Sequence, residues 1–212
     1  MKLFALHGFL GLPSDFNFLA DFNFLDVERI PIKPAKDLET WAEEFNRSII
    51  RDGSHDKNVL IGYSMGGRLA LHAWENRPTL WDKLILISTH PGLTNEEEKQ
   101  KRIESDEKWA RRFETEDWNS LMQAWNNQEV LKGMQIDRAE KDYDRKELAA
   151  YLRNFSLGKQ KVIEPQAIWL VGENDTKFRT RLNSLNPILV PNSGHRIPFE
   201  NPQFLKNFLE EL

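Results

Sequence analysis

Three side chains whose types together can activate a hydroxyl group are spread along the sequence: Ser64, Asp175 and His195. A serine hydroxyl becomes reactive when a histidine accepts its proton and a carboxylate orients that histidine. Residues 62–67, Gly-Tyr-Ser-Met-Gly-Gly, have the Gly-x-Ser-x-Gly pattern of the sharp strand-to-helix turn called a nucleophile elbow. The pattern predicts Ser64 as the reactive residue, and a glycine-rich turn with an incidental serine is the alternative.

The two candidate partners of the serine follow apolar runs that read as strands. Asp175 comes just after residues 167–172, and His195 comes just after residues 188–190. The order serine, acid, histidine is typical of this arrangement, so His195 is predicted to take the proton and Asp175 to orient the imidazole. As an alternative, Asp175 is only a turn or helix cap, and Glu173 is then the second candidate for the acid.

Negative charge that develops next to Ser64 needs two backbone N–H groups pointing at one place. Met65, the residue after the serine, is predicted to supply one. The loop that begins at His7 is predicted to supply the other through Phe9. His7 has no His, Asp or Glu partner at metal-ligand spacing, so we predict no metal and no cofactor.

Short apolar runs separated by amphipathic stretches position these residues. Residues 2–6, 58–62, 84–88, 167–172 and, more weakly, 188–190 read as buried strands. Residues 37–50 read as a helix with Asp37 as N-cap, and the C-terminal stretch reads as an amphipathic helix. This alternation predicts an α/β fold, with a mostly parallel sheet and helices on both faces.

One long segment lacks strand-like runs. Residues 92–160 hold 13 Lys or Arg and 15 Asp or Glu residues with helical periodicity. We predict a helical cap insertion at 92–160 and a core formed by residues 1–91 and 161–212. Ordinary crossover helices are the alternative, although one crossover needs far fewer residues.

Composition narrows the function classes. The 212 residues contain no cysteine, which excludes disulfides, thiolate metal sites and a cysteine nucleophile. The net charge of −4 speaks against nucleic acid as a partner, and no apolar run is long enough to span a membrane. The N-terminal residues do not resemble a signal peptide. We expect a cytoplasmic protein, monomeric or weakly homo-oligomeric, that acts on a small molecule.

The motifs together resemble the α/β-hydrolase superfamily and, more narrowly, are similar to the 2-succinyl-6-hydroxy-2,4-cyclohexadiene-1-carboxylate synthase family of menaquinone biosynthesis. The resemblance runs from residue 3 to residue 202. The particular matches are Gly66-Gly67-Arg68, His90-Pro91-Gly92-Leu93 and Asp175-Thr176-Lys177-Phe178. It implies an α/β-hydrolase fold, shortened at its N-terminus because the antiparallel strands usual before the first parallel strand are missing or reduced.

The resemblance also implies an activity and further site residues. The family eliminates pyruvate from an enolpyruvyl polycarboxylate and forms no acyl-enzyme, so the expected partner is a small-molecule polycarboxylate bound by cations. The residues that fall at substrate-binding positions are Arg68, Arg102, Arg153, Tyr63 and Trp125. Apart from the resemblance, His90 is a candidate for contact with substrate because it follows the predicted strand 84–88 and so opens toward the site, whereas His55 and His72 read as structural.

Two alternatives stay open: a small carboxylesterase or thioesterase with Ser64 as covalent nucleophile, and an inactive binding module of the same fold. One departure from the family concerns the residues after His195, which are Arg196-Ile197-Pro198 in place of the expected Asn-x-His.

Overall fold

The computed structural model describes residues 1–20, 26–52 and 57–211. Its centre is a six-stranded sheet in the order β2-β1-β3-β4-β5-β6, and all five strand pairings are parallel. The strands are β1 (Lys2–Leu6), β2 (Asp26–Ile30), β3 (Asn58–Tyr63), β4 (Lys83–Ile87), β5 (Ile168–Gly172) and β6 (Ile188–Val190).

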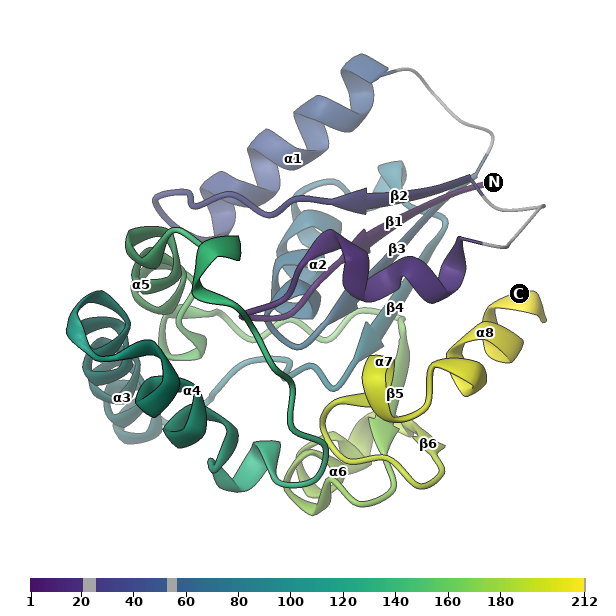
Figure 1. Ribbon diagram of the computed structural model, residues 1–212. Helices are drawn as coiled ribbons and strands as arrows, with labels where there is room; N and C mark the ends of the chain where they lie inside the picture. Colours follow the sequence, from purple (N-terminus) through teal and green to yellow (C-terminus); the bar gives the residue numbers. More distant parts are fainter. Residues whose placement is uncertain (21–25, 53–56, 212) are drawn as a thin grey trace.

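Helices cover both faces of the sheet (Figure 1). The α-helices are α1 (Leu38–Asp52), α2 (Met65–Asn76), α3 (Glu96–Thr115), α4 (Trp118–Asn126), α5 (Arg145–Asn154), α6 (Thr176–Leu182), α7 (Ile197–Glu200) and α8 (Pro202–Glu210). Short 3-10 turns are η1 (Pro13–Leu19), η2 (Pro78–Leu80), η3 (Glu129–Leu131), η4 (Glu140–Asp142), η5 (Leu157–Lys159) and η6 (Asn183–Leu185). The predicted fold class is confirmed.

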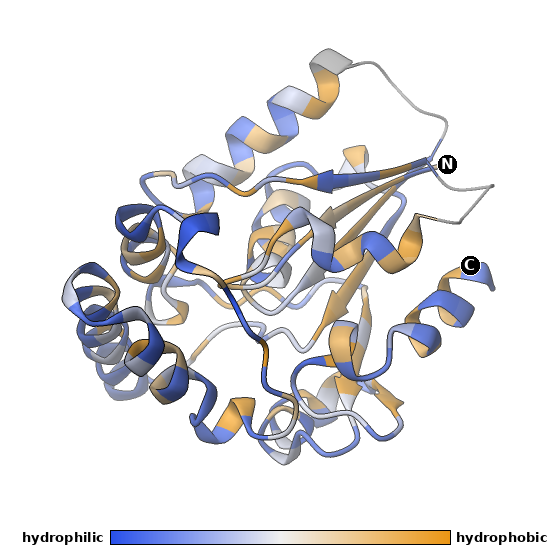
Figure 2. Ribbon diagram, in the orientation of Figure 1, coloured by the Kyte–Doolittle hydropathy of each residue, from blue (hydrophilic) through white to orange (hydrophobic). Residues whose placement is uncertain are grey.

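The central strands β1, β3, β4 and β5 are apolar on both sides because both faces of the sheet are buried there. In β1, Phe4 and Leu6 pack into the core under α1 and α2, whereas Leu3 and Ala5 face a second core under η1, α7 and α8. The central strands accordingly appear mostly orange in Figure 2, whereas β2 is largely blue, and the outer surfaces of the helices are mixed or hydrophilic.

One strand lies outside the sequence prediction. β2 has only Val27 and Ile30 as apolar residues, and it forms an edge of the sheet beside β1. An edge strand needs fewer apolar side chains than a central one, so its sequence resembles a polar loop. The other five strands and α1 lie within one or two residues of their predicted ends, and Asp37 accepts a hydrogen bond from the Thr40 N–H as the predicted N-cap (2.7 Å).

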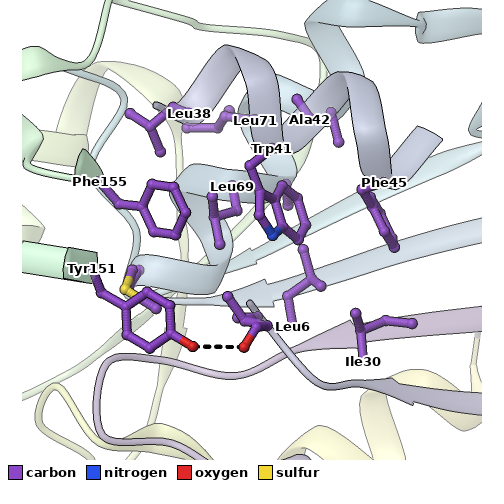
Figure 3. Close-up of a cluster of buried hydrophobic side chains, with 14 of the residues drawn as sticks. Leu6, Ile30, Leu38, Trp41, Ala42, Phe45, Leu69, Leu71, Tyr151 and Phe155 are labelled. Carbon is purple, nitrogen blue, oxygen red and sulfur yellow. Dashed lines mark hydrogen bonds between the residues drawn. The ribbon is translucent and has the colours of Figure 1, made fainter. Parts of the chain in front are cut away.

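Helices α3, α4 and α5 lie between β4 and β5 in the chain and gather at the end of the sheet toward which β1 runs (Figure 1). The α5 helix is tied to the core through Tyr151 and Phe155, which point toward Leu6 and Leu69 (Figure 3). The Tyr151 hydroxyl also donates to the Ile32 carbonyl (2.7 Å). The helical character predicted for residues 92–160 is present, and their status as a separate cap stays a prediction.

Candidate active site

Ser64 sits in a strained turn between β3 and α2. Its φ of 53° is in the left-handed region that side chains other than glycine rarely adopt. The glycines around it are needed because α2 approaches β1 very closely. A Cβ on Gly66 would lie 2.3 Å from the Leu6 carbonyl oxygen. The turn therefore has the geometry that the Gly-x-Ser-x-Gly pattern predicts.

The structure joins Ser64 to the two other predicted residues by a chain of hydrogen bonds. The Ser64 Oγ lies 3.1 Å from Nε2 of His195, and Nδ1 of His195 lies 2.9 Å from Oδ2 of Asp175. A neutral imidazole that donates from Nδ1 to the carboxylate keeps Nε2 as an acceptor for the serine proton. Ser64 and His195 are 131 residues apart in the sequence, and Asp175 and His195 are 20 apart. The three side chains come together because each residue follows the carboxyl end of a parallel strand.

Asp175 also fulfils its alternative role as a helix cap. Its Oδ1 accepts a hydrogen bond from the Phe178 N–H at the start of α6 (3.1 Å), while Oδ2 remains with the imidazole. Glu173 is exposed and its carboxylate accepts from the Asn192 N–H (3.2 Å). The structure therefore places Asp175, not Glu173, beside His195.

Two further residues hold the imidazole in place. The Phe178 ring packs 4.7 Å from the His195 ring, centroid to centroid. Glu200 Oε2 accepts from the backbone N–H groups on both sides of His195, those of Gly194 (2.8 Å) and Arg196 (3.1 Å). The sequence analysis gave Glu200 no role, because nothing in the local pattern separates it from an ordinary helix-end acid.

Two adjoining cavities meet at Ser64 and His195. The larger has a volume of about 290 Å³ and the smaller about 60 Å³. Phe9, Trp125 and Leu131 line both, so a ligand seated at the serine can extend into each. Met65 lines the larger cavity and Tyr63 the smaller. The roles of Phe9 and Met65 as oxyanion donors, and of Tyr63 and Trp125 as substrate contacts, stay predictions.

The larger cavity carries an excess of positive charge. Arg68, Arg102 and Lys177 line it, with Asp106 as the one carboxylate among its lining residues. The Nε of Arg102 donates to both Asp106 oxygens at 2.8 Å. Arg68 donates to the Phe155 carbonyl. In the described part of the chain no carboxylate pairs with Arg68, and burial, together with nearby Arg102, lowers its pKa to about 9. A cation that has lost water without gaining a counter-ion favours an anionic ligand.

The expectation for Arg153 needs correction. Arg153 does not line either cavity, and its guanidinium instead binds Glu107 (2.8 Å) and Glu114 (2.5 Å) on the α3 helix. The helix explains this: Tyr151 and Phe155 point into the core, and a residue two positions from Tyr151 is turned by about 200° to the other side. Sequence position alone did not reveal which face of α5 points inward.

A different arginine reaches the site. Arg138 lines the smaller cavity and donates to both oxygens of Asp15 (2.8 and 2.7 Å). The sequence analysis missed it because it lies in an irregular segment between η3 and η4, without periodicity to assign a face. Arg196 lines the same cavity, where its side chain donates to the Met134 carbonyl (2.5 Å) and to Asn126 (2.6 Å).

His72 and His55 are the two histidines that the sequence indicates to be structural. His72 is buried on α2, and His55 lies outside the described residues. Within residues 1–20, 26–52 and 57–211, no cluster of three His, Cys, Asp or Glu side chains could hold a metal ion. No helix in the described segments is long and apolar enough to cross a membrane.

A parallel sheet with a serine elbow, followed by an acid and a histidine at later strand ends, defines the α/β-hydrolase class of proteins. In agreement, residues 28–122 match the profile of the alpha/beta hydrolase fold family. The chain also aligns with MenH from S. aureus at a TM-score of 0.85 and 20% identity, covering 100% of this chain and 92% of that one.

Sequence relatives narrow the class. The 2-succinyl-6-hydroxy-2,4-cyclohexadiene-1-carboxylate synthase of Pectobacterium atrosepticum is 30% identical over 94% of this chain and 88% of its own length. The enzyme of the same name from Serratia proteamaculans is 33% identical over 71% of this chain and 67% of its own. The chain belongs to this synthase family of the α/β-hydrolase superfamily.

Proposed function

We propose that the protein is a carbon–oxygen lyase of menaquinone biosynthesis. It eliminates pyruvate from 5-enolpyruvoyl-6-hydroxy-2-succinyl-cyclohex-3-ene-1-carboxylate and forms 2-succinyl-6-hydroxy-2,4-cyclohexadiene-1-carboxylate. The observation that carries this proposal is that the Ser64–His195–Asp175 chain opens onto a cavity lined by three cations and one carboxylate. The names of the relatives support the same product.

In this proposal Ser64 and His195 act as the base. The ring carbon that bears the succinyl group carries an acidic proton, because the adjacent ketone can take up the negative charge. Ser64 Oγ takes this proton as its own passes to Nε2 of His195, and Asp175 stabilises the imidazolium. The electron pair moves through the ring double bond and breaks the bond between the ring carbon and the enol oxygen. The leaving group departs as the enolate of pyruvate and takes up a proton to become pyruvate, and loss of the proton from His195 restores the site.

The other residues bind and orient the substrate. The N–H groups of Phe9 and Met65 hold the ketone oxygen as it gains charge. Arg68 and Arg102 bind carboxylates in the larger cavity, and Arg138 takes the place expected of Arg153 by binding one in the smaller cavity. Tyr63 and Trp125 shape the walls. Positioning is decisive, since no covalent intermediate forms.

The test of the proposal is release of pyruvate from the enolpyruvyl substrate. A coupled lactate dehydrogenase reduces the pyruvate and so measures the rate of its release. We expect turnover by the wild type and a loss of at least about 1,000-fold in kcat for Ser64→Ala. Activity of the variant equal to the wild type would contradict the role of Ser64. Ester hydrolysis without pyruvate release would favour the esterase.

A further inference from the structure

Among the described residues, two buried polar atoms of side chains that line the larger cavity have no hydrogen-bond partner: Nε2 of His90 and Oγ of Ser88. Both residues follow β4, whose carboxyl end faces the cavity. Ser88 is fully buried and His90 is 8% exposed. Leaving such atoms unpaired is costly, so a cavity that keeps two of them is built to receive a polar group.

The protonation state of the His90 ring follows from its other nitrogen. The Gly92 N–H donates to Nδ1 of His90 at 3.0 Å, so Nδ1 is an acceptor and the proton of the neutral ring sits on Nε2. Burial, with the cations of Arg181, Arg68, Arg102 and Lys177 as smaller causes, lowers the pKa of His90 to about 4. At neutral pH the ring is therefore uncharged and carries its N–H donor at Nε2.

The surroundings fix the ring and the hydroxyl in place. The Gln160 side chain donates to the His90 carbonyl (3.0 Å), and the Phe178 ring meets the imidazole edge-on at 6.1 Å between centroids. Ser88 has a φ of 47°, a strained conformation held by the hydrogen bond from its N–H to the Leu170 carbonyl (2.9 Å). The His90 ring and the backbone that carries the Ser88 hydroxyl are thus positioned before any ligand arrives.

We propose that the Nε2–H of His90 and the hydroxyl of Ser88 form a neutral binding subsite for one carboxylate of the substrate, separate from the arginines. The assignment rests on the proposed function for the identity of that substrate. A neutral donor adds a hydrogen bond without adding charge to a cavity that already holds Arg68, Arg102 and Lys177. The subsite makes the position of the carboxylate, and not only its charge, a condition of binding.

Two substitutions of His90 separate binding from support of the loop. His90→Asn keeps an acceptor near Nδ1 for the Gly92 N–H but loses the donor at Nε2, whereas His90→Gln keeps a donor near Nε2 but loses the acceptor. We expect His90→Asn to raise KM by about 10- to 100-fold and His90→Gln by less than about 5-fold, with kcat changed less than KM in both. Ser88→Ala should raise KM by about 3- to 10-fold.

If the ring only supports its loop, the order is reversed, with His90→Gln more damaging than His90→Asn. That order, or equal losses, would overturn the subsite. The ¹⁵N spectrum of the labelled wild type must also show the Nε2–H form of His90 at pH 7, and an Nδ1–H form would contradict the assignment.

Failure of the proposed function is distinguishable. If the wild type releases no pyruvate, binding of phthalate, a stable ring dicarboxylate, is measured by tryptophan fluorescence in the same variants. A Kd raised about 10-fold or more in His90→Asn, but not in His90→Gln, would support the subsite independently of the reaction. Equal Kd values in both variants would overturn it.

Discussion

At the scale of single residues, the site depends on where charges lack partners. Among the described residues, Arg102 pairs with Asp106, Arg138 with Asp15, and Arg153 with Glu107 and Glu114, whereas the Arg68 guanidinium has the Phe155 carbonyl as its hydrogen-bond partner. An arginine without a carboxylate partner gains more from a ligand carboxylate than a paired one, because the Coulomb energy of the paired one is already partly satisfied. Arg68 is therefore the main anion-binding residue of the larger cavity in the proposed function.

Exchange of arginine for lysine tests which of two arginines contacts substrate. At position 138, a lysine keeps the positive charge that pairs with Asp15 but loses the planar guanidinium that binds a carboxylate through two hydrogen bonds. We therefore expect Arg138→Lys to raise KM by about 10-fold. Arg153→Lys is the matched control and should change KM by less than about 2-fold. Steady-state pyruvate release measures both. A raised KM for Arg153→Lys alone would restore the interpretation based on sequence position.

The residues that sequence reasoning found and missed differ in a physical way. Ser64, Asp175 and His195 were predictable because strand ends and chain order fix their meeting place. Arg138 was not, because an irregular segment has no period from which its direction follows. Whether a helical arginine faces a cavity also depends on packing, and Arg153 shows that position along the chain does not settle it.

At the scale of elements, the close approach of α2 to β1 shapes the elbow. Gly66 makes it possible, since a Cβ there would lie 2.3 Å from the Leu6 carbonyl oxygen and 2.4 Å from that of His7. The obstacle is backbone, which cannot rotate away as a side chain can. Gly67, the next residue, meets a different obstacle, since a Cβ there would lie 1.8 Å from Oγ1 of Thr89.

We expect Gly66→Ala to lower the free energy of unfolding by about 2 kcal/mol or more, because the added methyl group forces α2 away from β1. Glu75→Ala, at an exposed position of the same helix, is the control and should change it by less than about 1 kcal/mol. Urea unfolding followed by circular dichroism gives both values. Equal stability of Gly66→Ala and the wild type would mean that the helix can shift freely.

Element prediction succeeded where burial is two-sided. The four strands β1, β3, β4 and β5 are continuous apolar runs because helices cover both faces, and that pattern is visible in sequence. β6, at the other edge, gave a weaker signal, and its Ile188 and Leu189 are exposed. β2 was not predicted because it lies at an edge of the sheet and contains three charged residues, Asp26, Glu28 and Arg29, among its five. Only its pairing with β1 makes it a strand, and that long-range contact leaves no local trace.

At the scale of the whole molecule, buried neutral histidines make stability depend on pH. Nδ1 of His72 lies 3.4 Å from Oε1 of Glu39, but neither ring nitrogen makes a hydrogen bond among the described residues. Burial lowers the pKa of His72 to about 3, with Lys161 and Arg68 as smaller causes. The unfolded chain takes up a proton at this position below about pH 6.5. Between pH 6.5 and 3 the unfolded state therefore binds more protons, and stability falls as the pH falls.

We expect a decrease from pH 7 to pH 5 to lower the free energy of unfolding, with His72 contributing roughly 2 kcal/mol and His90 acting in the same direction. His72→Leu removes the titrating group and should flatten the dependence by about that amount. Urea unfolding at both pH values checks this. If the free energy of unfolding of His72→Leu falls between pH 7 and pH 5 as much as that of the wild type, His72 is not the source of the pH dependence.

The most direct measurement of the central claim compares two reactions on one preparation: pyruvate release from the enolpyruvyl substrate and hydrolysis of p-nitrophenyl acetate, each for the wild type and for Arg68→Met. If the cavity binds a polycarboxylate for elimination, the variant loses about 100-fold in kcat/KM for pyruvate release and less than about 3-fold for ester hydrolysis. Equal losses in both reactions, or a wild type that hydrolyses the ester and releases no pyruvate, would contradict it.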